Sequence, residues 1–174
     1  TMKTFFTTIF LFVITLPFFA QEKTRSRGDT SNYGFIRNRI KDQTVFITLD
    51  PKNVRAYRQR AEYKFDVEDW QGTLDDYSKA IEIEPGNYYY YYMRGACKDR
   101  LEDFRGALED YTKTIELDPG FEWGYHDRGL MNNELKKYKE AEADYKKALE
   151  LKPNWAAALF SLGANYEDQG EYAI

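Results

Sequence analysis

Cysteine and histidine are almost absent from the 174-residue sequence, which contains one of each, Cys97 and His126. One cysteine cannot form an internal disulfide, so packing must hold the fold together. One histidine leaves no His-based metal cluster and no second imidazole for proton transfer. Cys97 has no Cys-x-x-Cys neighbour, and we interpret it as a buried inert thiol rather than a nucleophile.

Phosphate-binding and nucleic-acid-binding signals are also missing. No glycine-rich phosphate loop occurs, because "PGN" and "PGF" have the form of turns. The net charge of −4 disfavours a nucleic-acid partner. From these absences we expect no enzyme activity, no metal, no cofactor and no nucleic-acid binding.

The one long apolar run, from Phe5 to Leu16, is shorter than the about 20 residues that a membrane span requires. Residues 1–20 have the form of a secretory signal peptide that ends at Ala20. Phe18 departs from the small-residue rule for cleavage, so an uncleaved membrane anchor is left open. The ending "AQE" resembles Gram-negative signal sequences. We therefore expect an exported protein, periplasmic or secreted, in a bacterial cell envelope.

The charge is unevenly spread along the chain. Residues 21–41 carry six Lys or Arg and two acidic residues, whereas residues 42–174 carry 18 basic and 27 acidic ones. We predict a basic flexible linker over 21–39, before an acidic body. A solvated linker is one interpretation, and contact with anionic lipid or a surface polymer is the other.

Proline is scarce, but beyond the signal it is evenly spaced, at Pro51, Pro85, Pro119 and Pro153. The gaps are equal, and a period of about 34 residues predicts internal repeats. Within each repeat, apolar and small positions recur three and four residues apart, the period of a helix. One helical hairpin cannot bury its faces alone, so neighbouring hairpins must stack into an all-α solenoid. The predicted repeats are 54–87, 88–121, 122–155 and a truncated fourth at 156–174.

The same positions resemble the tetratricopeptide repeat family. Position 4 of each complete repeat is tyrosine, position 8 is small, position 17 is aromatic and position 24 is tyrosine (Tyr77, Tyr111 and Tyr145). The resemblance covers 54–174 and implies a right-handed superhelical solenoid of antiparallel helix-turn-helix repeats, of an exported bacterial type. "FITLDP" (46–51) resembles the end of a second helix, so 40–53 is expected to be a degenerate N-terminal half-repeat.

Arginine occupies position 7, which is commonly apolar in this family, and aspartate occupies position 23. Because the two positions lie on facing helices of one hairpin, we predict an ion pair inside each repeat. We expect these pairs to fix helix register rather than to do chemistry. The pairs are Arg60–Asp76, Arg94–Asp110 and Arg128–Asp144.

In the family, the first helix of each repeat lines a concave groove. The resemblance therefore implies a groove with aromatic residues and mixed charges that binds a protein or peptide of unknown identity. The candidate residues are Arg55, Arg58, Glu62, Phe65, Tyr89, Tyr92, Asp99, Arg100, Trp123, His126, Asn133 and Phe160.

Five consecutive tyrosines, in "GNYYYYYMRG" (86–95), wrap fully round a helix because successive residues are 100° apart. They therefore cannot form one patch. We expect Tyr90 and Tyr91 to pack in the core, and Tyr89 and Tyr92 to face the groove.

Family members that grip the C-terminal carboxylate of heat-shock chaperones need Lys, Asn and Arg where this chain has Arg58, Glu62, Met93, Trp123 and Asp127. Only the first keeps a similar charge, so that clamp is not expected. The leading hypothesis is a non-catalytic protein–protein interaction scaffold. The alternative is the N-terminal repeat region of a longer protein whose other part is an enzyme, a sensor or an envelope-assembly factor.

Overall fold

Eight α-helices, and no β-strand, make up residues 30–170, the part of the chain that this computed structural model describes. The all-α repeat solenoid predicted from the sequence is confirmed. The predicted signal peptide, 1–20, lies outside the described residues. Within them, no helix combines the length and the apolar character that a membrane span needs. The helices are α1 (Thr30–Leu49), α2 (Val54–Asp66), α3 (Trp70–Ile83), α4 (Tyr88–Arg100), α5 (Phe104–Leu117), α6 (Glu122–Glu134), α7 (Tyr138–Leu151) and α8 (Ala156–Asp168).

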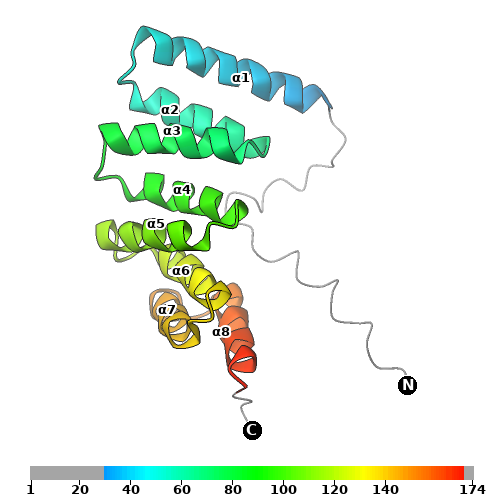
Figure 1. Cartoon of the computed structure of the whole chain (residues 1–174), viewed down its shortest axis with the longest axis vertical. Helices are drawn as coiled ribbons and strands as arrows, with labels where there is room; N and C mark the ends of the chain where they lie inside the picture. Colours follow the sequence, from blue (N-terminus) through cyan, green and yellow to red (C-terminus); the bar gives the residue numbers. More distant parts are fainter. Residues whose placement is uncertain (1–29, 171–174) are drawn as a thin grey trace. The chain divides into compact units, whose positions relative to one another are not determined.

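The helices form antiparallel hairpins that follow one another in chain order (Figure 1). We call α2, α4, α6 and α8 the A helices, and α3, α5 and α7 the B helices. Each B helix packs on the A helix before it and on the A helix after it. The three complete hairpins fall within the three repeats placed by the proline spacing.

A left-handed residue makes each tight turn between an A helix and its B helix. Glu68, Glu102 and Lys136, at repeat position 15, have φ angles of 62°, 61° and 57°. This conformation is common just after a helix ends, although glycine adopts it at lower cost. Two of the B helices then begin at a capping aspartate, because Asp69 and Asp103 accept hydrogen bonds of 3.0 Å from backbone N–H groups.

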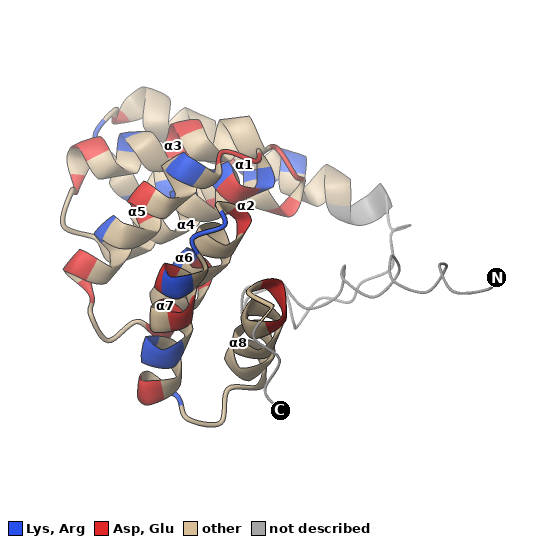
Figure 2. Cartoon of the chain, turned by 60° about the horizontal axis from the view of Figure 1, so that its bottom comes forward, with Lys and Arg blue, Asp and Glu red and all other residues tan. Residues whose placement is uncertain are grey.

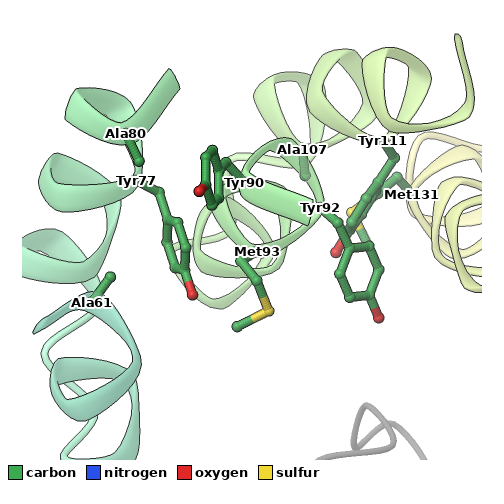
Figure 3. Packing of buried hydrophobic residues seen from close by; sticks show 9 residues of the cluster. All are labelled: Ala61, Tyr77, Ala80, Tyr90, Tyr92, Met93, Ala107, Tyr111 and Met131. Atoms are coloured by element: carbon green, nitrogen blue, oxygen red, sulfur yellow. The ribbon is translucent and has the colours of Figure 1, made fainter. Parts of the chain in front are cut away.

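Tyrosine at position 24 and a small residue at position 8 form the centre of each hairpin. Tyr77, Tyr111 and Tyr145 are fully buried (Figure 3 shows the first two). A Cβ atom added to Gly95 would lie 2.9 Å from Tyr111 Cε1, and one added to Gly129 would lie 2.7 Å from Tyr145 Cε1. The tyrosine rings therefore lie directly on the glycine backbone, which lets the two helices approach closely.

Helix α1 differs from the sequence prediction. Residues 30–39, expected as the second half of a flexible linker, are helical, and the expected half-repeat 40–53 is the end of the same helix and the turn after it. The reason is a helical stripe that the linker interpretation overlooked. Ile36, Ile40, Gln43 and Ile47 recur four and three residues apart, and among residues 33–49 they are the buried or partly buried ones.

Candidate functional site

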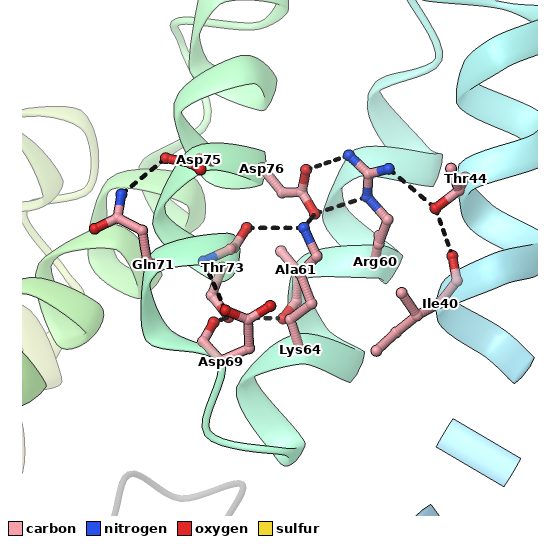
Figure 4. A network of polar contacts seen from close by, with 11 residues as sticks. Ile40, Thr44, Arg60, Ala61, Lys64, Asp69, Gln71, Thr73, Asp75 and Asp76 are labelled. Atoms are coloured by element: carbon pink, nitrogen blue, oxygen red, sulfur yellow. Dashed lines mark hydrogen bonds and ion pairs between the residues drawn. The ribbon is translucent and has the colours of Figure 1, made fainter. Parts of the chain in front are cut away.

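An arginine–aspartate pair crosses every complete hairpin, as the sequence pattern predicts. Nε and Nη2 of Arg60 donate to the two carboxylate oxygens of Asp76 at 2.9 and 2.6 Å (Figure 4). Arg94 and Asp110 form the same two bonds at 2.8 and 2.6 Å. In the third repeat, Arg128 and Asp144 do so at 3.0 and 2.6 Å. The aspartates are buried, and the hydrogen bonds to them raise the pKa of Arg60 and Arg94.

Each buried aspartate has a second partner at position 11 of the A helix, which the sequence analysis missed. Lys64 Nζ lies 2.9 Å from Asp76, and Lys98 Nζ lies 2.8 Å from Asp110. In the third repeat, the Asn132 amide donates to Asp144 at 3.0 Å. Position 11 is one helical turn from position 7, so the sequence alone could have predicted that a lysine there reaches the same aspartate. Two of the arginines also donate through Nη1 to the helix before their hairpin, Arg60 to Thr44 on α1 at 3.1 Å and Arg94 to Ser78 on α3 at 3.3 Å, so these networks have a structural role.

The A helices share one face that hydrogen bonds connect from repeat to repeat. The Tyr92 hydroxyl on α4 donates to Asp127 on α6 at 2.9 Å. Asn133 on α6 donates to Asp168 on α8 at 3.0 Å. Each bond joins two residues that are 35 apart, one more than the repeat length. The donor and the acceptor therefore occupy adjacent repeat positions in successive repeats. We call this surface, made by positions 2, 5, 6, 9, 12 and 13 of α2, α4, α6 and α8, the A-helix face.

Two residues expected as exposed contacts, Tyr92 and His126, are buried instead, with exposed fractions of 5% and 4%. The reason lies at the last position of repeats 2 and 3, which is aromatic. Phe121 packs edge-on against Tyr92 with ring centroids 4.9 Å apart, and Trp155 packs on His126 at 4.7 Å. In both cases the last position of a repeat covers position 5 of the same repeat. In repeat 1 that last position is Asn87, and Arg58 stays partly exposed.

The tyrosine run divides differently from the prediction. Tyr90 is in the core as expected, but Tyr91 is partly exposed and Tyr92 is buried. The Tyr91 hydroxyl donates to the Pro85 carbonyl at 3.2 Å, and Arg94 lies over its ring. Only Tyr89 keeps the partly exposed place on the A-helix face that we expected, and burial raises its pKa to about 12.

The remaining candidates differ in how far they are available to a partner. Phe160 is 61% exposed, and Arg55 and Arg100 are also exposed. Trp123 packs on Trp155 with ring centroids 4.5 Å apart, so only part of it is free. The other partly buried candidates are Arg58, Glu62, Phe65, Tyr89, Asp99 and Asn133.

Sequence reasoning also missed a serine–histidine–aspartate contact on this face. His126 Nδ1 lies 2.7 Å from Asp127 Oδ1, and its Nε2 lies 3.2 Å from Ser161 Oγ on α8. Acyl transfer by such a group needs backbone or side-chain donors for an oxyanion. Ser161 is inside α8, where its N–H belongs to the helical hydrogen-bond ladder. The contact therefore supports a bridge between α6 and α8.

Asp99 is the one strongly perturbed acid of the A-helix face. Burial is the main cause that raises its pKa to about 6, and the charges of Asp127 and Glu134 add to it against the opposing effect of Arg100. Asp99 and Glu134 occupy positions 12 and 13 of successive repeats, as Asn133 and Asp168 do. A hydrogen bond joins the second pair, whereas the first pair consists of two carboxylates.

Metal and thiol chemistry find no support in residues 30–170. No group of three or more His, Cys, Asp or Glu in this part of the chain could hold a metal ion. Cys97 is buried, as predicted, and burial raises the pKa of its thiol to about 12. A thiol with such a pKa is a poor nucleophile near neutral pH.

Comparison with known sequences identifies the repeats. The sequence patterns of the tetratricopeptide repeat match residues 88–121 and 123–154. No curated protein matches the chain.

Solved structures show the same fold. The chain resembles MamA with a TM-score of 0.77 at 20% identity, over 81% of this chain and 77% of that one. It resembles YrrB, described as a tetratricopeptide-repeat protein with an unusual peptide-binding site, with a TM-score of 0.73 at 20% identity, over 82% and 74%. The first such domain of Spaghetti (RPAP3), bound to the HSP90 peptide SRMEEVD, gives 0.66 at 25% identity, over 70% and 96%. Proteins of this fold are generally non-catalytic scaffolds.

Proposed function

Because the chain belongs to the tetratricopeptide repeat family, it is a protein–protein interaction scaffold, and we propose that its A-helix face binds an extended peptide or protein segment. We propose further that the chain does no catalysis itself. The observation that carries the proposal is Asp99. It is a partly buried carboxylate set against a second carboxylate where the next repeat has a hydrogen-bonded pair. A partly buried carboxylate beside a second carboxylate costs stability, and such unfavourable placements are expected where a surface serves binding.

The face around Asp99 has the chemistry of a contact surface. Phe160 offers an exposed ring, while Tyr89 and Trp123 offer part of theirs. Acidic and basic residues are interspersed over the helices (Figure 2). Aromatic and arginine side chains dominate binding energies in protein interfaces. Because the helices are already packed, a partner need not order them, which lowers the cost of binding.

The heat-shock clamp is not part of this proposal. At two positions where that clamp needs polar side chains, this chain has Met93, which is 8% exposed, and Asp127, which is bonded to Tyr92. Neither can donate to a peptide carboxylate. We also propose that the protein is exported, on the sequence of residues 1–20. The processed N-terminus of the chain expressed in a Gram-negative host, read by mass spectrometry, would test this.

A peptide-display selection on the wild-type chain tests the binding proposal. We expect enriched peptides whose affinity falls about tenfold or more with Phe160→Ala, and also with Arg100→Ala, as at interface hot spots. Leu159→Ala is the matched control, because Leu159 is 51% exposed on the same helix but lies at position 4, away from the A-helix face. No enrichment, or an equal loss with the control variant, would contradict the proposal.

A further inference from the structure

Helix α1 has an uncovered stripe next to its buried one. Phe35, Arg39, Asp42, Phe46 and Leu49 recur at intervals of four and three residues, so they lie along one side of the helix. The three apolar members are 54%, 51% and 77% exposed. Arg39 and Asp42 lie 3.8 Å apart with side chains 46% and 56% exposed, and the Arg39 guanidinium also lies over the ring of Phe35, 4.9 Å from its centroid.

The repeat register explains why this stripe is apolar. Adding one repeat length of 34 to the residue numbers of α1 aligns its sequence with that of α3, a B helix. There the stripe of Thr73, Asp76 and Ala80 is buried against the A helix of the same hairpin. Among residues 30–170, α1 has no A helix of its own, and it lies at one end of the row of helices (Figure 1).

An A helix in the usual place would not fit α1. The small Thr73 and Ala80 of α3 correspond to Arg39 and Phe46 in α1, and their bulk would hold a helix away from the close approach seen in the repeats. The stripe therefore suits a partner that has room for large side chains and offers opposite charges to Arg39 and Asp42.

The order of residues in the stripe is self-complementary. It reads apolar, basic, acidic, apolar, with Phe35 as far before Arg39 as Phe46 is after Asp42. We propose that α1 pairs with α1 of a second copy, antiparallel about a two-fold axis. Arg39 then faces the partner's Asp42, Asp42 faces the partner's Arg39, and Phe35 meets the partner's Phe46. One two-fold operation makes every contact twice, as in an isologous dimer.

Only the antiparallel arrangement satisfies these charges. In a parallel pair, Arg39 would face the partner's Arg39 and Asp42 the partner's Asp42, and such like-charge contacts weaken association. In the antiparallel pair, both ion pairs lie at the centre, with aromatic contacts on either side. The two helices, each 20 residues and about 30 Å long, can run side by side over most of their length.

Charge reversal on the full chain tests the proposal by sedimentation equilibrium. We expect the wild type to dimerise. Arg39→Glu leaves two acidic residues in the stripe, and Asp42→Arg leaves two basic ones, so each variant alone should dimerise at least about tenfold more weakly. An equimolar mixture of the two variants should form a heterodimer, because each stripe then faces the opposite charge. The double variant, with the two charges exchanged, should dimerise again.

The mixture and the double variant separate this interface from loss of folding, because both contain the same substitutions. Arg105→Glu, an exposed reversal on α5, is the charge control and should leave dimerisation unchanged. A monomeric wild type, with α1 covered by another segment or by a different partner, would overturn the proposal. So would a dimer that all the variants form equally well.

Discussion

Asp99 lies partly buried on α4 and forms no ion pair or hydrogen bond with another side chain of residues 30–170. One repeat further along the same face, the equivalent residue is an amide, Asn133, and it donates a hydrogen bond of 3.0 Å to Asp168. Stability would favour an amide at both places. The carboxylate at Asp99 is therefore a residue whose ionised form the fold disfavours.

We predict that Asp99→Asn stabilises the chain near neutral pH. The raised pKa of about 6 means that folding favours the protonated carboxyl. That contribution is fully present below the ordinary pKa near 4 and is lost as pH rises through 6. The amide carries no charge, and by analogy with the Asn133–Asp168 hydrogen bond we expect it to donate to Glu134. We expect a gain on the order of 1–2 kcal/mol at pH 7.5, reduced by partial exposure, and little at pH 4.

Urea unfolding of both chains at several pH values measures this difference. Asp66→Asn is the control, because Asp66 lies on the A helix α2 but is exposed, and surface substitutions of this kind stay within about 0.5 kcal/mol. A constant difference between the Asp99 variant and the wild type from pH 4 to 7.5 would show that the carboxylate is not perturbed.

At the scale of elements, the contact between an A helix and its B helix depends on position 8. Gly129 and Gly163 occupy this position in successive repeats, yet their surroundings differ. A Cβ on Gly129 would meet the buried ring of Tyr145 at 2.7 Å, whereas a Cβ on Gly163 would have nothing within 4 Å. The two glycines thus separate the packing role of glycine from its intrinsic cost in a helix.

We predict opposite signs for Gly129→Ala and Gly163→Ala. The first should destabilise by about 1–3 kcal/mol, because α6 and α7 must move apart to admit the methyl group. The second should stabilise by up to about 1 kcal/mol, through helix propensity alone. Thermal unfolding of the two variants measures both. A stabilising Gly129→Ala would mean that the ring of Tyr145 can move aside.

Element boundaries were predictable where proline and turn residues punctuate the chain. The three hairpins follow from the equal proline spacing, and the ion pairs follow from positions 7 and 23. Helix α1 was predictable only in part, because composition favoured a linker over residues 21–39. Its stripe from Ile36 to Ile47 has helical spacing, but Arg37, Arg39 and Lys41 between those residues hid it.

Over the whole molecule, the repeat pattern predicts where each residue lies within its hairpin. It does not predict which side chains cover that residue where successive hairpins meet. The A-helix face shows this limit, since Tyr92 and His126 have the groove position of the family and are nevertheless buried. Phe121 and Trp155 cover them from the following turn, where a capping residue such as Asn87 would leave them open. A consensus position carries no information about a neighbour that departs from the consensus.

The repeats should therefore be coupled through side chains as well as through stacking. In a solenoid, stability is close to a sum of repeat and interface contributions, so one interface can be weakened alone. Tyr92 and Tyr91 are adjacent in the sequence, but their hydroxyl groups bond to different parts of the chain. The Tyr92 hydroxyl bonds to Asp127 in the next repeat, whereas the Tyr91 hydroxyl bonds to Pro85 in the turn just before its own helix.

We predict that Tyr92→Phe speeds amide hydrogen exchange in α6 as well as in α4. The substitution leaves Asp127 with one hydrogen bond fewer in a partly buried site, at a cost of about 1–3 kcal/mol. Exchange followed by mass spectrometry resolves the two helices separately. Tyr91→Phe, which removes a hydroxyl that bonds to an exposed turn, should change both by less than about 0.5 kcal/mol. If Tyr92→Phe affected α4 alone, the repeats would be coupled by backbone packing and not by this hydrogen bond.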